Sequence, residues 1–133
     1  MSIQICKNFN LCIKDFLKEI LKISKLNCLR TLSFKINTLF KVNICTNILI
    51  TTFIEYITPD EDLIMKQDRQ LFTNLINKER KNNGEFYDLM LELNKIWDKL
   101  SKNNKEKVFE YLLVLNFYAK EHLRHFLTDK NEK

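Results

Sequence analysis

The sequence has almost no glycine or proline: Gly84 and Pro59 are the only residues of their kinds among 133. Average usage would give roughly nine glycines and about six prolines in a chain of this length. Sheet proteins need glycine-rich turns between strands, so this shortage favours long helices with few tight corners. It also excludes the glycine-rich loops that cradle phosphate groups in nucleotide-binding enzymes.

The sequence also has no apolar run long enough to cross a membrane. The longest, residues 42–57, is interrupted by Asn43, Asn47 and Glu55, whereas a membrane span needs about twenty predominantly apolar residues. The start, MSIQICKNFN, lacks the charged and apolar regions of a secretory signal. With 45% apolar and 29% charged residues, the composition is typical of a soluble globular domain. We therefore expect one intracellular domain without a transmembrane segment.

The spacings of metal and nucleophile motifs are missing as well. No two cysteines have C-x-x-C spacing, and no histidine is near them in the sequence. His122 and His125 are three residues apart, whereas the zinc-protease signature H-E-x-x-H places its histidines four apart around a glutamate. We expect exposed histidines, no metal, no cofactor and no enzyme. The four cysteines are Cys6, Cys12, Cys28 and Cys45. We interpret them preferably as free buried thiols, and the alternative is a disulfide framework.

What the sequence does contain is helical periodicity. Apolar residues recur at three- and four-residue steps over residues 10–26 and again over residues 86–100, which predicts two amphipathic helices. Ser101 is expected to cap a last helix that ends near Leu127, with residues 128–133 as a flexible tail. The body of that helix, VFEYLLVLNFYA, is apolar around most of its circumference, which is typical of a central buried helix. Trp97 is expected in the core.

Residues 27–57 allow two interpretations. The apolar residues of TLSFKI and LFKVNI alternate, as in a β-hairpin, but they also fit helical faces. Asn37-Thr38 is a poor hairpin turn because it has no glycine, so helices are preferred. After Pro59 a single apolar stripe predicts one further helix that ends in KERKNNG. Together these segments predict an all-α fold, one compact bundle of five or six helices.

The segment Thr58-Pro59-Asp60-Glu61-Asp62 has the residues of a helix start. Thr58 and Glu61 match the capping box, in which each side chain bonds a backbone N–H of the other end of the first turn. Proline suits the first helical position, and the carboxylates suit the positive end of the helix dipole. We therefore assign Thr58, Pro59 and Glu61 a structural role. A helix should begin at Pro59, within one residue, and the three carboxylates should hold no ligand.

The positive charge is concentrated before this segment. Residues 1–57 contain eight Lys/Arg and three Asp/Glu, whereas residues 58–133 (the helices of 58–127 and the tail) contain fourteen Lys/Arg and fourteen Asp/Glu. The whole net charge of +5 therefore lies in residues 1–57. Lysines at four-, four- and three-residue steps form a stripe on the first helix, joined by Arg30, while Asp15 and Glu19 flank it. The lysines of this stripe are Lys14, Lys18, Lys22 and Lys25. Nucleic acid or an anionic surface is the usual binding partner of such a stripe. The preferred interpretation is nevertheless a helix face that is only solvated.

The pattern IWDKLSKNNKEKVFEYLLVL, preceded by FIEYITPDEDLI, resembles an arrangement in small uncharacterised proteins of large (giant) DNA viruses. The similarity covers about the last half of the chain and implies a helix, a capped connection and a closing helix. It implies no activity, and none of the matching residues carries chemistry: Trp97, Leu100, Ser101, Asn104, Lys105, Tyr111 and Leu112. A virus would place the protein in the cytoplasm or nucleus of a host, or in the virion.

The leading functional hypothesis is a non-enzymatic helical protein that acts through another protein or through self-association. The alternative is a nucleic-acid-binding module that uses the lysine stripe. A pull-down from the native host would distinguish a protein partner from nucleic acid.

Overall fold

The structure, a computed structural model, describes residues 2–24, 27–79, 91 and 93–131, and every regular element in these residues is helical. The all-α class is confirmed. A helical segment at residues 91 and 93–96 brings the α-helices in the described residues to seven, so the predicted five or six is too low. The other elements are α1 (Ser2–Ser24), α2 (Asn27–Val42), α3 (Ile48–Tyr56), η1 (Thr58–Asp60), α4 (Glu61–Met65), α5 (Gln70–Glu79), η2 (Trp97–Lys99) and α7 (Lys102–Asn131).

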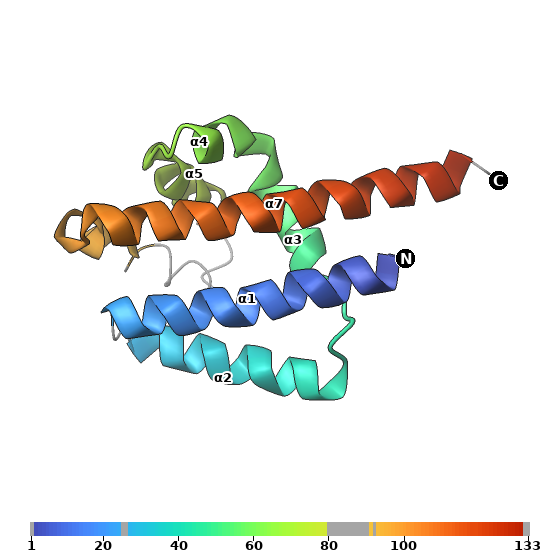
Figure 1. Cartoon of the computed structure of the whole chain (residues 1–133), viewed down its shortest axis with the longest axis horizontal. Coiled ribbons are helices and arrows are strands. Elements are labelled where there is room, and N and C mark those ends of the chain that lie inside the picture. The colour runs from blue at the N-terminus through green and yellow to red at the C-terminus, as the bar shows by residue number, and fades with distance from the viewer. Residues whose placement is uncertain (1, 25–26, 80–90, 92, 132–133) are drawn as a thin grey trace.

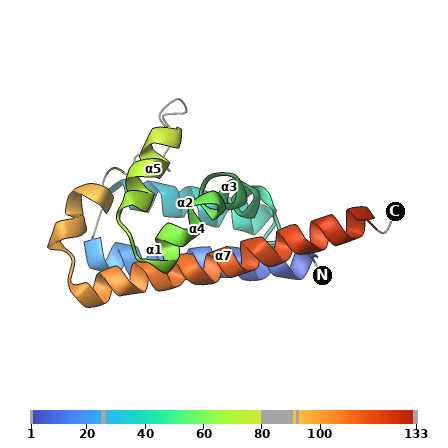
Figure 2. The same ribbon diagram turned by 90° about the horizontal axis from the view of Figure 1, so that it is seen from above.

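Three long helices set the architecture (Figure 1). α1 lies between α2 and α7 and runs antiparallel to both. The shorter helices α4 and α5 lie on the side of α7 that faces away from α1, and α3 crosses behind α7. Seen from above, the last turns of α7 project beyond the N-terminal end of α1 (Figure 2). α1 therefore has two different faces, one toward α7 and one toward α2.

One hydrophobic core joins these elements. Phe9 on α1 meets Phe53 on α3 edge to face at 5.5 Å between ring centroids, and Phe16 stacks on Tyr111 of α7 at 5.2 Å. Trp97 is buried, as predicted, and packs between Phe72 and Phe109, with centroids 5.0 and 5.6 Å away. Aromatic pairs in these geometries add stability beyond the area that they bury.

Residues 30–42 are helical, which settles the choice between hairpin and helix in favour of the helix. α1 begins earlier than expected, at Ser2, because Ile5, Cys6 and Phe9 extend the apolar stripe toward the start of the chain. Ser101 caps α7 as predicted: its hydroxyl oxygen accepts a hydrogen bond from the backbone N–H of Asn104 at 3.1 Å.

The expectation for α7 is only partly met. One face, from Val108 to Ala119, is buried against α1 and α3. The opposite face exposes large apolar side chains, with Phe117 61% exposed, because no described element covers it. The helix also continues to Asn131, so most of the segment predicted as a flexible tail, residues 128–133, is helical.

The capping box predicted for Thr58 and Glu61 is wrong. Thr58 and Pro59 lie inside the short helix η1, which has no side-chain cap, and the buried Thr58 hydroxyl has no hydrogen-bond partner. A helical turn does begin within one residue of Pro59, but the α-helical part, α4, starts only at Glu61. The carboxylates instead join distant elements: Asp60 pairs with Lys78 of α5 at 2.7 Å, and Glu61 bonds to residues of α7.

The single helix expected after Pro59 is broken between α4 and α5. Gln67 has a positive φ of 54°, its N–H bonds to the carbonyl of Ile64, and the N–H of Asp68 bonds to the carbonyl of Leu63. These two bonds are the Schellman motif, which usually has glycine at the left-handed position. The sequence signal for a break was therefore missing.

No helix in the described ranges combines the length and the apolar character needed to cross a membrane. The predicted absence of a transmembrane segment agrees with this finding.

Candidate functional site: a basic groove between α1 and α2

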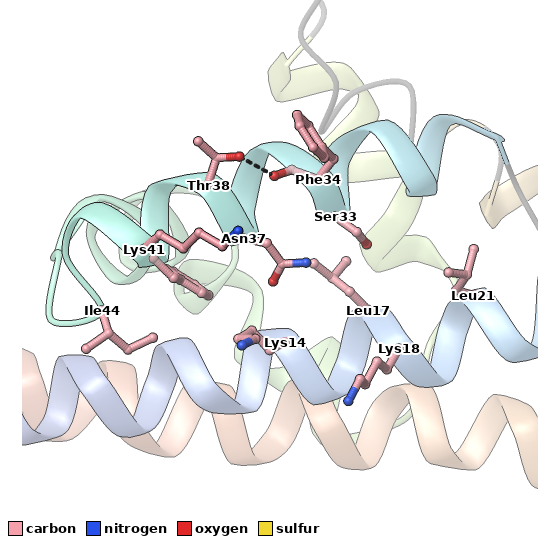
Figure 3. Close-up of a pocket in the computed structure, with 11 residues that line it drawn as sticks. Lys14, Leu17, Lys18, Leu21, Ser33, Phe34, Asn37, Thr38, Lys41 and Ile44 are labelled. Carbon is pink, nitrogen blue, oxygen red and sulfur yellow. Dashed lines mark hydrogen bonds between the residues drawn. The ribbon is translucent and has the colours of Figure 1, made fainter.

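A groove of about 570 Å³ runs between α1 and α2 (Figure 3). Its apolar floor includes the buried side chains of Leu17 and Phe40. Polar and charged side chains stand above this floor, and Asn37 extends from α2 into the space between the helices. The lining residues are Lys14, Leu17, Lys18, Leu21, Ser33, Phe34, Asn37, Thr38, Phe40, Lys41 and Ile44.

The charges that line the groove all have one sign. Lys14 and Lys18 lie one turn apart on α1, Lys41 lies in the last turn of α2, and no carboxylate of the described residues belongs to the lining. None of the three lysines pairs with a carboxylate in the described part of the chain. Because like charges repel at this spacing, the arrangement is suited to an anionic partner.

Of the two carboxylates that flank the stripe in sequence, Glu19 does not line the groove and faces α7 instead. Glu19 lines a separate cavity with Lys107, Glu110 and Tyr111 of α7. The pKa of Tyr111 is raised, first by burial and then by the negative charges of Glu19 and Asp15. Lys14 and Lys18 therefore line the groove beside α2, whereas Glu19 lines a cavity with residues of α7.

The predicted lysine stripe divides into three parts. Lys14 and Lys18 line the groove, Lys22 pairs with Glu19 at 3.6 Å, and Lys25 lies outside the described residues. Arg30 is exposed on α2 and does not belong to the groove lining. Lys41, which the sequence only showed to add to the charge of the first part, joins the groove because α2 folds back antiparallel to α1.

Groups on α2 offer further contacts. Ser33 and Asn37 line the groove with a hydroxyl and an amide, which can donate hydrogen bonds to phosphate oxygens or base edges. Phe34 stands at the rim, 73% exposed. An aromatic ring beside a basic groove is the combination that binds single-stranded nucleic acid, since bases stack on the ring while lysines follow the backbone.

A second cluster was missed by the sequence analysis. Cys6 Sγ lies 3.7 Å from Nδ1 of His122, and both line a cavity of about 260 Å³ together with Cys45. The pKa of the Cys6 thiol is raised by burial and by the nearby Cys45, and burial lowers the pKa of His122. His122 is thus half-buried, not exposed as expected. Residues 116 positions apart meet here because α1 and α7 are antiparallel, and no local spacing signals that contact.

Metal binding finds no support in the described residues. No three or more side chains of His, Cys, Asp or Glu come together there in an arrangement that holds a metal ion. His122 and His125 belong to the same helix, α7, but His122 contacts Cys6.

The fold and the groove define an all-α protein with a one-signed cationic surface between its first two helices. Comparisons with protein-family models, with curated proteins and with solved structures found no match. The resemblance to small proteins of large DNA viruses therefore stays a prediction.

Proposed function

We propose that the chain is a non-enzymatic intracellular protein that binds single-stranded nucleic acid in the groove between α1 and α2. The observation that carries the proposal is the set of three lysines, Lys14, Lys18 and Lys41, around an apolar floor, with no carboxylate among the described residues of the lining. Lysine ammonium groups bind phosphates as point charges and release the counterions condensed on the nucleic acid, which favours association.

A single strand suits the groove better than a duplex. The groove is a local depression between two helices, and its polar groups, Ser33 and Asn37, lie beside its lysines. Such a space accepts unpaired bases and their phosphates, whereas a duplex presents a wide, continuous backbone surface. Phe34 at the rim offers a stacking surface that tolerates any base.

The test is binding of a fluorescently labelled oligothymidylate, followed by anisotropy at increasing salt. If the three lysines each contact a phosphate, log K should fall with log salt with a slope of about −2. Reversing all three lysines to glutamate should weaken binding at low salt by on the order of a hundredfold and remove most of the salt dependence. Phe34→Ala should weaken binding about tenfold, as the loss of one stacked base predicts.

A matched control separates the groove from the net charge. Lys66, Lys99 and Lys107 are exposed, lie outside the groove and form no ion pair in the described residues. Reversing these three lysines to glutamate changes the net charge by the same amount. If both triple variants lose equal affinity, or if the groove variant binds like the wild type, the proposal is wrong. Equal affinity for duplex DNA, or preference for anionic vesicles, would also contradict it.

The exposed apolar side of α7 supports a second candidate, self-association of two copies of this chain. Leu123, Phe126 and Leu127 are exposed on α7 after His122, which contacts Cys6 of α1. Figures 1 and 2 show the last turns of α7 projecting from the body. The nearby charges are paired within the chain, Arg124 with Glu121 at 2.7 Å and Lys120 with Glu61 at 3.1 Å. Because the neighbouring charges are already paired, this apolar surface is better suited to bind the same surface of a second copy than to bind a charged partner.

Light scattering coupled to size exclusion measures this directly. Two copies should give twice the mass of the chain at micromolar concentration, and Phe126→Glu should return the protein to a monomer without unfolding it. Phe34→Glu is the control, because Phe34 is also an exposed phenylalanine but lies on α2, and this variant should leave the dimer intact. A wild-type monomer at high concentration contradicts this candidate and leaves the groove proposal unaffected.

A further inference from the structure

Cys6, Cys45 and His122 come from three separate parts of the fold and line one cavity of about 260 Å³. Cys6 lies on the first turns of α1, Cys45 in the connection between α2 and α3, and His122 near the end of α7. Hydrogen bonds hold the backbone on both sides of Cys45. The Asn10 side-chain amide, one turn after Cys6, donates hydrogen bonds to the carbonyls of Ile44 at 2.7 Å and Thr46 at 2.9 Å, on both sides of Cys45.

The two thiols differ in accessibility. Cys6 is 3% exposed, whereas Cys45 is half-buried and can be reached by a small reagent entering the cavity. Nδ1 of His122 lies 3.7 Å from the Cys6 sulfur, close enough to take its proton as the side chains adjust. Burial keeps this imidazole in its neutral form, because it lowers the pKa of His122. The same burial raises the pKa of Cys6, so that this thiol needs a base to become a nucleophile.

We propose that Cys6 and Cys45 are a reactive thiol pair that a low-molecular-weight disulfide, such as oxidised glutathione, converts to an intramolecular disulfide. The Cys45 thiolate attacks one sulfur of the reagent, whose S–S bond breaks and releases one thiolate. Cys6 gives its proton to Nδ1 of His122 and attacks the sulfur of Cys45, and the second reagent thiolate leaves and is protonated. The protein loses two thiol hydrogens and two electrons, and the reagent gains both as two thiols.

The product joins the first turns of α1 to the connection that follows α2. It involves neither the groove lysines nor the projecting end of α7, so the inference is independent of both proposed functions. The two other cysteines provide internal controls. Cys12 is half-buried, does not line this cavity, and has a pKa raised to about 11 by burial and by Asp15, so it should react slowly.

The experiment treats the full-length folded protein with oxidised glutathione, blocks remaining thiols with N-ethylmaleimide in acid, and measures intact mass and a non-reducing peptide map. The expected product is a chain that has lost two hydrogens, carries two blocked thiols and shows a cross-link between Cys6 and Cys45. Cys6→Ser should instead accumulate a stable glutathione adduct on Cys45. Cys45→Ser should give neither product, and Cys12→Ser should behave as the wild type.

His122→Gln tests the proton acceptor. It should slow closure of the disulfide roughly tenfold or more while leaving its identity unchanged, whereas His125→Gln, three residues further along α7, should not slow it. A cross-link to Cys12 or Cys28, a persistent adduct on the wild type, or no reaction overturns the proposal. The peptide map of the wild type alone decides among these outcomes, so the conclusion does not depend on a variant that folds poorly.

Discussion

Asn10 shows how much one buried side chain can determine. It is fully buried on α1, and its amide donates two hydrogen bonds to carbonyls of the connection between α2 and α3. That connection supplies Ile44 to the basic groove and Cys45 to the thiol cavity. The two bonds satisfy the buried Nδ2 donor of Asn10, whereas its buried Oδ1 has no hydrogen-bond partner among the described residues. Through Nδ2, Asn10 specifies the course of a segment that has no helical structure of its own.

Asn10→Asp should lower the free energy of unfolding by about 2–4 kcal/mol, because it keeps the shape of the side chain and replaces the donor with an acceptor facing two carbonyls. Urea denaturation followed by the fluorescence of Trp97, the single tryptophan, measures this loss. Asn8→Asp is the control, since the side chain of Asn8 only accepts a bond from Gln4 near the surface and an aspartate accepts it equally well. An Asn10→Asp variant as stable as the wild type would show that these bonds do not hold the connection.

Glu61 gives a residue-scale prediction of pH dependence. Its carboxylate accepts hydrogen bonds from the amide of Asn116 and the ammonium group of Lys120, both at 3.1 Å, and these contacts lower its pKa below the ordinary value of 4.5. The folded state therefore favours the charged form. The resulting stability is present above pH 4.5 and is lost as the pH falls from there through the lower folded value.

Because the Glu61 side chain is 39% exposed, solvent screening limits the effect to below about 1 kcal/mol. Glu61→Gln should remove that part of the acid sensitivity, measured as the difference in unfolding free energy between neutral and acidic solution. Glu106→Gln is the control of equal charge change, because Glu106 lies on the same helix as Asn116 and forms no ion pair in the described residues. Equal acid sensitivity of the wild type and Glu61→Gln would contradict the assignment.

At the scale of helices, the periodic spacing of apolar residues predicted most of the helices, and a serine before the last helix predicted its N-terminal cap. α1, α2 and α7 follow apolar stripes, and the Ser101 cap follows from a serine before a helical run. The break at Gln67 was not predictable because a residue with a side chain occupies the left-handed position where glycine is the usual signal. The groove was half predictable: Lys14 and Lys18 share a helix face, but the contribution of Lys41 depends on how α2 packs on α1.

Gln67→Gly should stabilise the protein by about 0.5–1 kcal/mol. A residue with a Cβ in the left-handed region costs about 1–2 kcal/mol, and the greater freedom of glycine in the unfolded chain returns part of this gain. Lys66→Gly is the control, because Lys66 has an ordinary helical φ of −87°, where glycine only adds unfolded-state entropy and destabilises by about 0.5–1 kcal/mol. The midpoint of urea unfolding should move in opposite directions for the two variants. A shift in the same direction would contradict the strained conformation at Gln67.

At the scale of the whole molecule, charge and apolar surface are distributed on different sides. The groove between α1 and α2 carries unpaired lysines, whereas the surface of α7 carries exposed apolar residues with neighbouring ion pairs. On α1, Lys14 and Lys18 line the groove beside α2, whereas Glu19 lines a cavity with residues of α7. A surface that only needs to be solvated gains from mixing its charges, so unmixed lysines in a groove carry an energetic cost that a binding role explains.

This cost gives a prediction in which stability and binding change in opposite directions. Replacing Lys14, Lys18 and Lys41 with glutamine lowers the net charge from +5 to +2, since three positive charges are removed from +5, and ends the repulsion across the groove. The unfolding free energy at low ionic strength should rise by about 0.5–1 kcal/mol, because like-charge pairs one turn apart cost a few tenths each. Near 1 M salt the gain should vanish, since the screening length then falls to about 3 Å.

The same variant should bind oligothymidylate at least about tenfold more weakly, because the phosphates lose their counterparts. The corresponding glutamine replacements at Lys66, Lys99 and Lys107 change the net charge equally and should alter neither quantity by a comparable amount. Chemical denaturation at two salt concentrations and anisotropy on one protein preparation measure both effects. If the groove variant is less stable at low salt, the lysines have partners that support the fold. The three lysines would then serve to stabilise the fold, and their unmixed charge would no longer indicate a nucleic-acid site.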